Sequence, residues 1–142
     1  EQLVRALALS NLIAVHIHYY MGHLSALCGI LIAGTGSASA ITYLMGGSYG
    51  QVVNTIKTMC SNLTGMMCDG AKQGCALKVY SGVSAAVQAA LLSMKGIKTH
   101  DDGIIEDDIE KTIRNVGLIG TAGMEQTDKT ILGIMCRKQR ME

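Results

Sequence analysis

The first half of the chain contains two long runs with almost no charged side chains. The first run, Gln2–Met21, contains no helix-breaking residue and stops at Gly22. The second, His23–Met45, stops at the Gly46–Gly47 pair, and no Asp, Glu, Lys or Arg occurs between Arg5 and Lys57. Glycine is common just past the end of a helix, so the pattern predicts a helix over each run.

Both runs approach the length of about 20 apolar residues that spans a bilayer. A transmembrane hairpin is therefore one interpretation. However, the first run contains Asn11, His16 and His18, and the second contains five serine and threonine residues. These are Ser25, Thr35, Ser37, Ser39 and Thr42. We favour two buried core helices and expect no membrane partner.

Two further helices are predicted in the middle of the chain. Ser48 is a suitable N-cap for a helix that extends to about Ser61. Its apolar face has helical spacing and consists of Val52, Val53, Ile56 and Met59. The alanine-rich stretch Cys75–Met94 predicts a second amphipathic helix, which closes at Gly96.

The last third of the chain predicts a loop and two more helices. The loop is Lys98–Gly103, and the next helix begins with Asp107 and Asp108 in its first turn. Its basic residues, Lys111 and Arg114, come later, an order that suits the helix dipole, although a solvated charged face explains the same residues.

The final helix is predicted to follow a loose glycine-rich connection. This connection contains Gly117, Gly120 and Gly123. Thr127 would cap a helix from Asp128 to about Lys138, and the tail Arg137–Glu142 is expected to be exposed to solvent.

These elements predict an all-α fold, a compact bundle of about six helices with a cysteine-bearing loop between two of them. At 142 residues the chain is expected to form a single domain, 1–142. The sequence has no Pro, Trp or Phe but 17 Gly, so the core must consist of Leu, Ile, Val, Met and Ala. Because the chain begins at Glu1, we expect it to be part of a longer protein.

Charge and cysteine content exclude several classes of function. The net charge of +1 gives no electrostatic reason to expect a nucleic-acid partner. Five cysteines, an odd number, and the lack of a secretory signal argue against an extracellular disulfide framework. Reduced thiols in the cytoplasm are the simpler expectation.

The glycines at Gly34 and Gly36 superficially match a dinucleotide-binding loop. That fingerprint requires a third small residue, a βαβ unit and an acidic residue about 20 positions later, which binds the ribose. No acidic residue lies in that region. We therefore interpret these glycines as positions where another helix crosses closely.

The stretch Gly65–Lys78 concentrates more reactive residues than any other part of the chain. Cys68 and Cys75 are seven positions apart, with Asp69 and Lys72 between them. Thiolates, glycines that permit turns, and nearby cations or N–H donors are what a metal-binding loop needs. The residues predict such a loop, although two cysteines at this spacing also occur without a metal.

Five segments together resemble the C-terminal half of the iron-sulfur L-cysteine desulfidase family. This family is related to the alpha chain of iron-sulfur L-serine dehydratase, and many of its members are known only as uncharacterised cytosolic proteins. The matching segments are GHLSALCG (22–29), SNLTGMMCDGAKQGCALK (61–78), AAVQAALL (85–92), DDIEKTIRN (107–115) and GMEQTDKTILGIM (123–135).

The resemblance implies a 4Fe-4S cluster held by Cys28, Cys68 and Cys75. Three thiolates leave one iron of such a cluster with an open site, which can act as a Lewis acid. The resemblance assigns no role to Cys60 or Cys136, which are expected to be a buried or a surface thiol.

It also implies an α,β-elimination that converts L-cysteine or L-serine to pyruvate and ammonia and releases sulfide or water. The reaction would need no pyridoxal phosphate. A base must remove the α-proton, and Lys72, Lys78, His16, His18 and His23 are the candidates. Lys72 and Lys78 are alternatively expected to neutralise the negative charge of the cluster, and each histidine taken singly is more often a structural residue.

Two departures from the family put catalysis by this chain alone in question. The family's N-terminal half, with a GCTEP-type motif and much of the substrate pocket, has no counterpart here. A lysine-bearing stretch of the family is replaced by the residues 16–23. An N-terminal domain or subunit is thus the expected partner, and homo-oligomers are compatible with the sequence. The alternative is a non-catalytic helical module that is stabilised by zinc or docks to the missing half.

Overall fold

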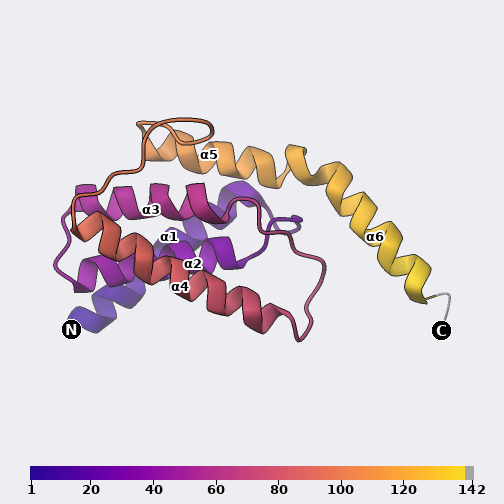
Figure 1. Cartoon of the computed structure of the whole chain (residues 1–142), viewed down its shortest axis with the longest axis horizontal. Helices are drawn as coiled ribbons and strands as arrows, with labels where there is room; N and C mark the ends of the chain where they lie inside the picture. The colour runs from indigo at the N-terminus through magenta and orange to yellow at the C-terminus, as the bar shows by residue number, and fades with distance from the viewer. Residues whose placement is uncertain (140–142) are drawn as a thin grey trace.

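The computed structural model describes residues 1–139 and is all-helical, as predicted (Figure 1). Six α-helices and one 3-10 helix lie in this range, beside a single isolated β-bridge. The helices are α1 (Gln2–Met21), α2 (Ile30–Leu44), α3 (Tyr49–Leu63), α4 (Cys75–Met94), α5 (Ile109–Gly120), η1 (Ala122–Met124) and α6 (Glu125–Gln139). The end of the predicted exposed tail, 140–142, lies outside the described residues.

Helix α2 lies at the centre of the bundle, in contact with α1, α3 and α4. Its small residues allow neighbouring helices to approach closely. A Cβ atom on Gly36 would lie 2.4 Å from the backbone oxygen of Ser10 in α1, so only glycine fits there. The buried hydroxyls are satisfied within the helix, since Thr35 donates to the Leu31 carbonyl at 2.6 Å and Ser39 donates to the Thr35 carbonyl at 2.8 Å.

Helix α3 begins where the sequence predicts. The Ser48 side chain accepts a hydrogen bond from the Gln51 N–H, and the Gln51 side chain accepts one from the Ser48 N–H, which makes a capping box. Further along, the hydroxyls of Thr42 in α2 and Thr55 in α3 are 2.9 Å apart in the buried interface. This polar contact fixes how the two helices face each other.

The predicted helix over His23–Met45 is wrong at its first residues. Gly22 ends α1 with φ 72°, and α2 begins only at Ile30. The residues between them form a non-helical segment in which Leu27 pairs with Met67 as an isolated antiparallel bridge. A distant segment has therefore replaced local helical hydrogen bonds, and hydropathy alone carries no sign of such a pairing.

The predicted loose connection at Gly117 and Gly120 is also wrong, because both glycines are buried within α5. A Cβ on Gly117 would lie 2.6 Å from the Tyr20 Cβ, so this glycine serves close packing against α1. Asp108 is the N-cap of α5 and accepts from the Glu110 N–H at 2.9 Å. Asp107 precedes the helix.

Helix α6 extends away from the other helices in Figure 1 and, among the described elements, contacts η1. It starts at Glu125, so Thr127 lies inside it and is not its cap. Within residues 1–139, α4 is the one helix both long and apolar enough to cross a membrane, a test that core helices of soluble proteins also pass. The two uncharged runs that suggested a membrane hairpin do not form helices that meet it.

Candidate functional site

Cys28 and Cys68 lie beside each other at one end of the bundle because two backbone hydrogen bonds join their segments. The Cys28 N–H donates to the Met66 carbonyl at 2.8 Å, and the Cys68 N–H donates to the Ala26 carbonyl at 2.6 Å. In an antiparallel pair, such diagonal neighbours point to the same side and lie about 7–8 Å apart. Both thiols are half-buried.

Cys75 is the first residue of α4, as predicted, and it closes the cysteine loop that begins at Gly65. Its sulfur accepts a hydrogen bond from the Lys72 N–H at 3.4 Å and donates to the Gly70 carbonyl at 3.8 Å. Gly70 has φ 94°, a conformation that favours glycine, and it allows the loop to turn back towards the helix.

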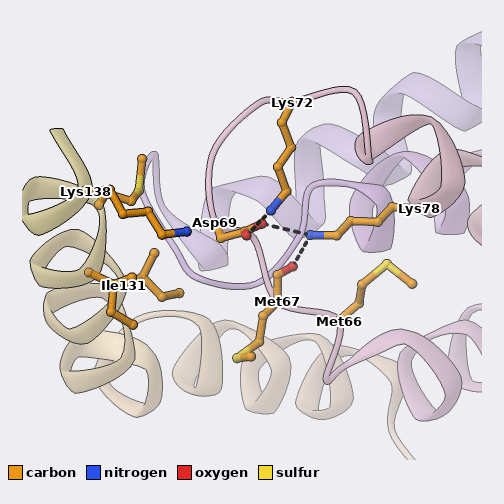
Figure 2. Close-up of a pocket in the computed structure, with 9 residues that line it drawn as sticks. Met66, Met67, Asp69, Lys72, Lys78, Ile131 and Lys138 are labelled. Carbon is orange, nitrogen blue, oxygen red and sulfur yellow. Dashed lines mark hydrogen bonds and ion pairs between the residues drawn. The ribbon is translucent and has the colours of Figure 1, made fainter. Parts of the chain in front are cut away.

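A cluster of charges fills the space between the loop and α4 (Figure 2). Asp69 pairs with the ammonium groups of Lys72 and, at 3.4 Å, Lys78. The Lys78 Nζ also donates to the Met67 carbonyl at 2.6 Å. Lys78 thus holds the loop to α4, whereas the pair of Lys72 and Asp69 lies within the loop.

The two lysines change the acidity of this cluster. The hydrogen bond from Lys72 lowers the pKa of Asp69, against a smaller opposing effect of burial, and Lys78 adds to the lowering. Burial opposes the charge on Lys78, yet the pKa of Lys78 is raised, by Asp69 first and then by the thiols of Cys28 and Cys68. Lys78 therefore lies close enough to two predicted ligands to respond to their charge.

A cavity of about 610 Å³ separates this cluster from α6. Its charged side consists of Asp69, Lys72, Lys78 and Lys138, and its apolar side of Met66, Met67, Ile131, Ile134 and Met135. Figure 2 shows Asp69 between Lys138 on α6 and the two lysines of the loop and α4. Two ammonium groups therefore pair with Asp69, and a third, that of Lys138, lines the same cavity from α6.

Two of the predicted histidines line a smaller cavity of about 270 Å³ together with Cys68. These are His18 at the end of α1 and His23 just after it, with ring centroids 5.6 Å apart at an angle of 71°. His16, the third candidate, points elsewhere and its Nε2 lies 2.8 Å from a carboxylate oxygen of Glu110. Sequence reasoning missed Glu110 because its partner is 94 positions away.

The remaining two cysteines have the positions expected of thiols without a ligand role. Cys60 is fully buried in α3, where burial raises its pKa to about 12. Cys136 is exposed on α6.

The donor types at this end of the bundle suit an iron-sulfur cluster, since thiolates are the usual ligands of such clusters. The three half-buried thiols lie on one loop and on the segment paired with it. They do not converge on one point, because no group of three His, Cys, Asp or Glu side chains in residues 1–139 is arranged to hold a metal ion. The set therefore fits the cluster in donor chemistry, and the three thiols are not arranged around one point in this structure.

Comparison with known proteins supports the resemblance seen in the sequence. A UPF0597 protein of Phocaeicola vulgatus is 52% identical over 140 residues, which is 98% of this chain and 32% of the relative. UPF0597 proteins of Parabacteroides distasonis and Oleidesulfovibrio alaskensis are 51% and 48% identical, over 97% and 98% of this chain and 32% and 33% of their own lengths. No solved structure matches the chain significantly.

The chain thus spans about a third of the length of the curated relatives that it matches. The family profile described as serine dehydratase alpha chain matches residues 1–133, nearly the whole chain. The protein therefore belongs to the serine dehydratase alpha chain family.

Proposed function

We propose that this chain is the cluster-bearing helical part of an iron-sulfur lyase that performs α,β-elimination on a small L-amino acid, L-cysteine or L-serine. The observation that carries the proposal is the grouping of Cys28 and Cys68 across one backbone pair, with Cys75 at the start of the adjoining helix. Family membership supports the lyase class, and the three thiols support the iron-sulfur cofactor.

We infer that Cys28, Cys68 and Cys75 would hold a 4Fe-4S cluster. When bound, such a cluster supplies a Lewis-acidic iron with one open coordination position. The chain's contribution is electrostatic: a cluster with three thiolate ligands is negatively charged, and Lys78 already responds to two of those thiols. Lys72 and Lys78 both pair with Asp69. We therefore propose that they neutralise the charge of the cluster and do not act as the base.

We propose His23 as the base that takes the α-proton of the amino acid. Its side chain shares a cavity with Cys68, and no carboxylate pairs with its ring among the described residues. Imidazole is suited to proton transfer near neutral pH. His18 lies against it and would orient the ring, whereas the contact between His16 and Glu110 leaves His16 less suited to this role.

We further propose that the rest of the substrate pocket comes from the part of the longer protein that this chain does not span. The relatives are about three times as long as the matched segment. A cytoplasmic location is the setting in which the cysteines would stay reduced for cluster assembly.

The test is anaerobic reconstitution of the chain with iron and sulfide, followed by iron analysis and by visible and EPR spectra. We expect uptake of about four irons by the wild type and loss of uptake in Cys28→Ala, Cys68→Ala and Cys75→Ala. Cys60→Ala and Cys136→Ala are the matched controls and should bind iron normally. Retention of zinc without any cluster would instead favour the alternative, a non-catalytic zinc-stabilised module.

Catalysis is tested by pyruvate release from L-cysteine and from L-serine. The reconstituted chain should be joined to the remaining part of a relative, so that the substrate pocket is complete. We expect His23→Gln to retain the cluster spectrum and lose pyruvate formation. Pyruvate formation at the wild-type rate by this variant would exclude His23 as the base.

A further inference from the structure

One side of the central helix α2 is largely left uncovered by the described elements, and of the residues in this sector only Ala40 is buried, at 8% exposure. Ala33, Ser37 and Leu44 are exposed there, and at about 100° of rotation per residue they fall within roughly 40° of one another. Gly36, which packs against α1, lies on one side of this strip, and Ile30, which packs against Gly82 of α4, lies on the other. The strip is therefore bordered by α1 and α4, which do not contact each other within residues 1–139.

Both bordering helices present apolar side chains next to this strip. On α1, Leu3 and Leu7 lie on the side away from α5 and are 62% and 53% exposed. On α4, a row at positions i, i+4 and i+8 begins beside the buried residues Ala86 and Ala90. This row consists of Val83, Val87 and Leu91, which are between 41% and 53% exposed.

We call these eight residues the open face. Its members are Leu3, Leu7, Ala33, Ser37, Leu44, Val83, Val87 and Leu91. None of them is charged, in contrast to the outer surface of a typical amphipathic helix. The central helix is covered by α1, α3 and α4 on its other sides, and α5 links α1 to α3, so among the described helices the open face is the side of α2 between α1 and α4.

We propose that the open face is the docking surface for an apolar helix from the part of the longer polypeptide that this chain does not span. Two thirds of the length of each relative lies outside the matched segment, so polypeptides that carry this fold contain ample chain to cover it. Ala33 and Ser37 lie four positions apart on the exposed strip of α2. Their small side chains let the backbone of such a helix approach closely. Because the face has no charge, the covering helix presents an uncharged apolar stripe.

The low burial of α4 is consistent with a covering helix on the open face. The most apolar window of α4 is hydrophobic enough to cross a membrane, yet only 28% of it is buried here. A covering helix would place α4 in the interior of the complete protein. The two rival occupants, a second copy of this chain and a lipid bilayer, are separate outcomes of the test.

The test uses a chimera in which this chain replaces the matched segment of the Phocaeicola vulgatus relative. Leu7→Lys and Val87→Lys are made in the chimera and in the isolated chain. We expect each to lower the thermal midpoint of the chimera by at least roughly 5 °C, because the ammonium would be buried there. In the isolated chain the same lysines stay in water and should change the midpoint little.

Matched controls use exposed leucines that lie outside the open face. Leu12 on α1 and Leu118 on α5 are 68% and 63% exposed, and their lysine variants should leave both proteins unchanged. Equal effects of face and control variants in the chimera would overturn the proposal, as would an unmodified chimera no more stable than the isolated chain. A dimer of the isolated chain that Leu7→Lys converts to monomer, or sedimentation of the chain with phosphatidylcholine–phosphatidylglycerol vesicles, would assign the face to a rival occupant.

Discussion

Cys60 and Cys68 are eight positions apart in the chain and lie in opposite environments. Cys60 is in the middle of α3, has no exposed surface and touches the apolar core. Cys68 is half-buried in the cysteine loop, next to a cavity and close to the ammonium group of Lys78. The contrast teaches that the backbone, and not the residue type, decides which thiols of this chain can serve as ligands.

The regions around the two cysteines also differ in how they are held. In the core around α3, helices meet through small residues and through hydroxyl contacts such as that between Thr42 and Thr55, while the buried hydroxyl of Thr64, one turn after Cys60, has no hydrogen-bond partner among the described residues. Around Cys68, one backbone pair and the charges on Asp69 and Lys78 hold the loop. The first region is held by close packing of side chains, whereas the second is held by a few polar contacts at the end of the bundle.

Thiol reactivity should show the largest difference between the two regions. At pH 8 a pKa of about 12 in place of 9.0 reduces the thiolate fraction of Cys60 roughly 1000-fold. We therefore expect iodoacetamide to modify Cys60 far more slowly than the half-buried Cys68, as measured by mass spectrometry of the resulting peptides. Exposed Cys136 is the internal control for reagent access. Comparable labelling of Cys60 in the folded chain would contradict its placement in the core.

The second-largest expected effect is a loss of folding stability at alkaline pH, where Cys60 ionises. Because the folded pKa of Cys60 is raised, its proton contributes stability that is complete below pH 9 and is lost as the pH rises towards 12. The loss amounts to about 4 kcal/mol over this range. We expect Cys60→Ala to lose less stability than the wild type between pH 8 and pH 11 in urea unfolding. Cys68→Ala, the control from the loop, should follow the wild-type curve.

The tight packing of the core should make Gly36 intolerant of a side chain. A Cβ there would contact the Ser10 backbone at 2.4 Å, so α1 would have to move away from α2. We expect Gly36→Val to lower the free energy of unfolding by about 3 kcal/mol. Gly50 in α3 has open space around it, and Gly50→Ala should be neutral or slightly stabilising. Equal effects of the two substitutions would contradict this packing.

The sequence predicted the helices well where local signals decide them. The limits of α1 and α4 and the N-cap at Ser48 follow from glycine stops, apolar periodicity and cap chemistry. The sequence-based prediction failed where contacts between distant residues determine the local structure. Examples are the pairing of Leu27 with Met67 and the packing of Gly117 against Tyr20. No local pattern encodes those partners.

The candidate site could be predicted only as a set of residues. The cysteines and lysines were found from their density in one stretch and from the resemblance, and Lys78 does lie near Cys28 and Cys68. The sequence could not show that His18 and His23 share a cavity with Cys68 while His16 turns to Glu110. Those relations depend on how the end of α1 meets the cysteine loop.

The smallest effect we expect is a local loosening of the cysteine loop. Lys78→Met removes the hydrogen bond from the Nζ to the Met67 carbonyl, a contact that holds the loop to α4. The amides of Cys28 and Cys68, which bond across the backbone pair, should then exchange with solvent several times faster, while global unfolding is unchanged. Lys72→Met, which removes only the pairing with Asp69, is the matched control and should leave the exchange unaltered. Hydrogen exchange with mass spectrometry measures both, and equal protection in all three proteins would mean that the backbone pair alone holds the loop.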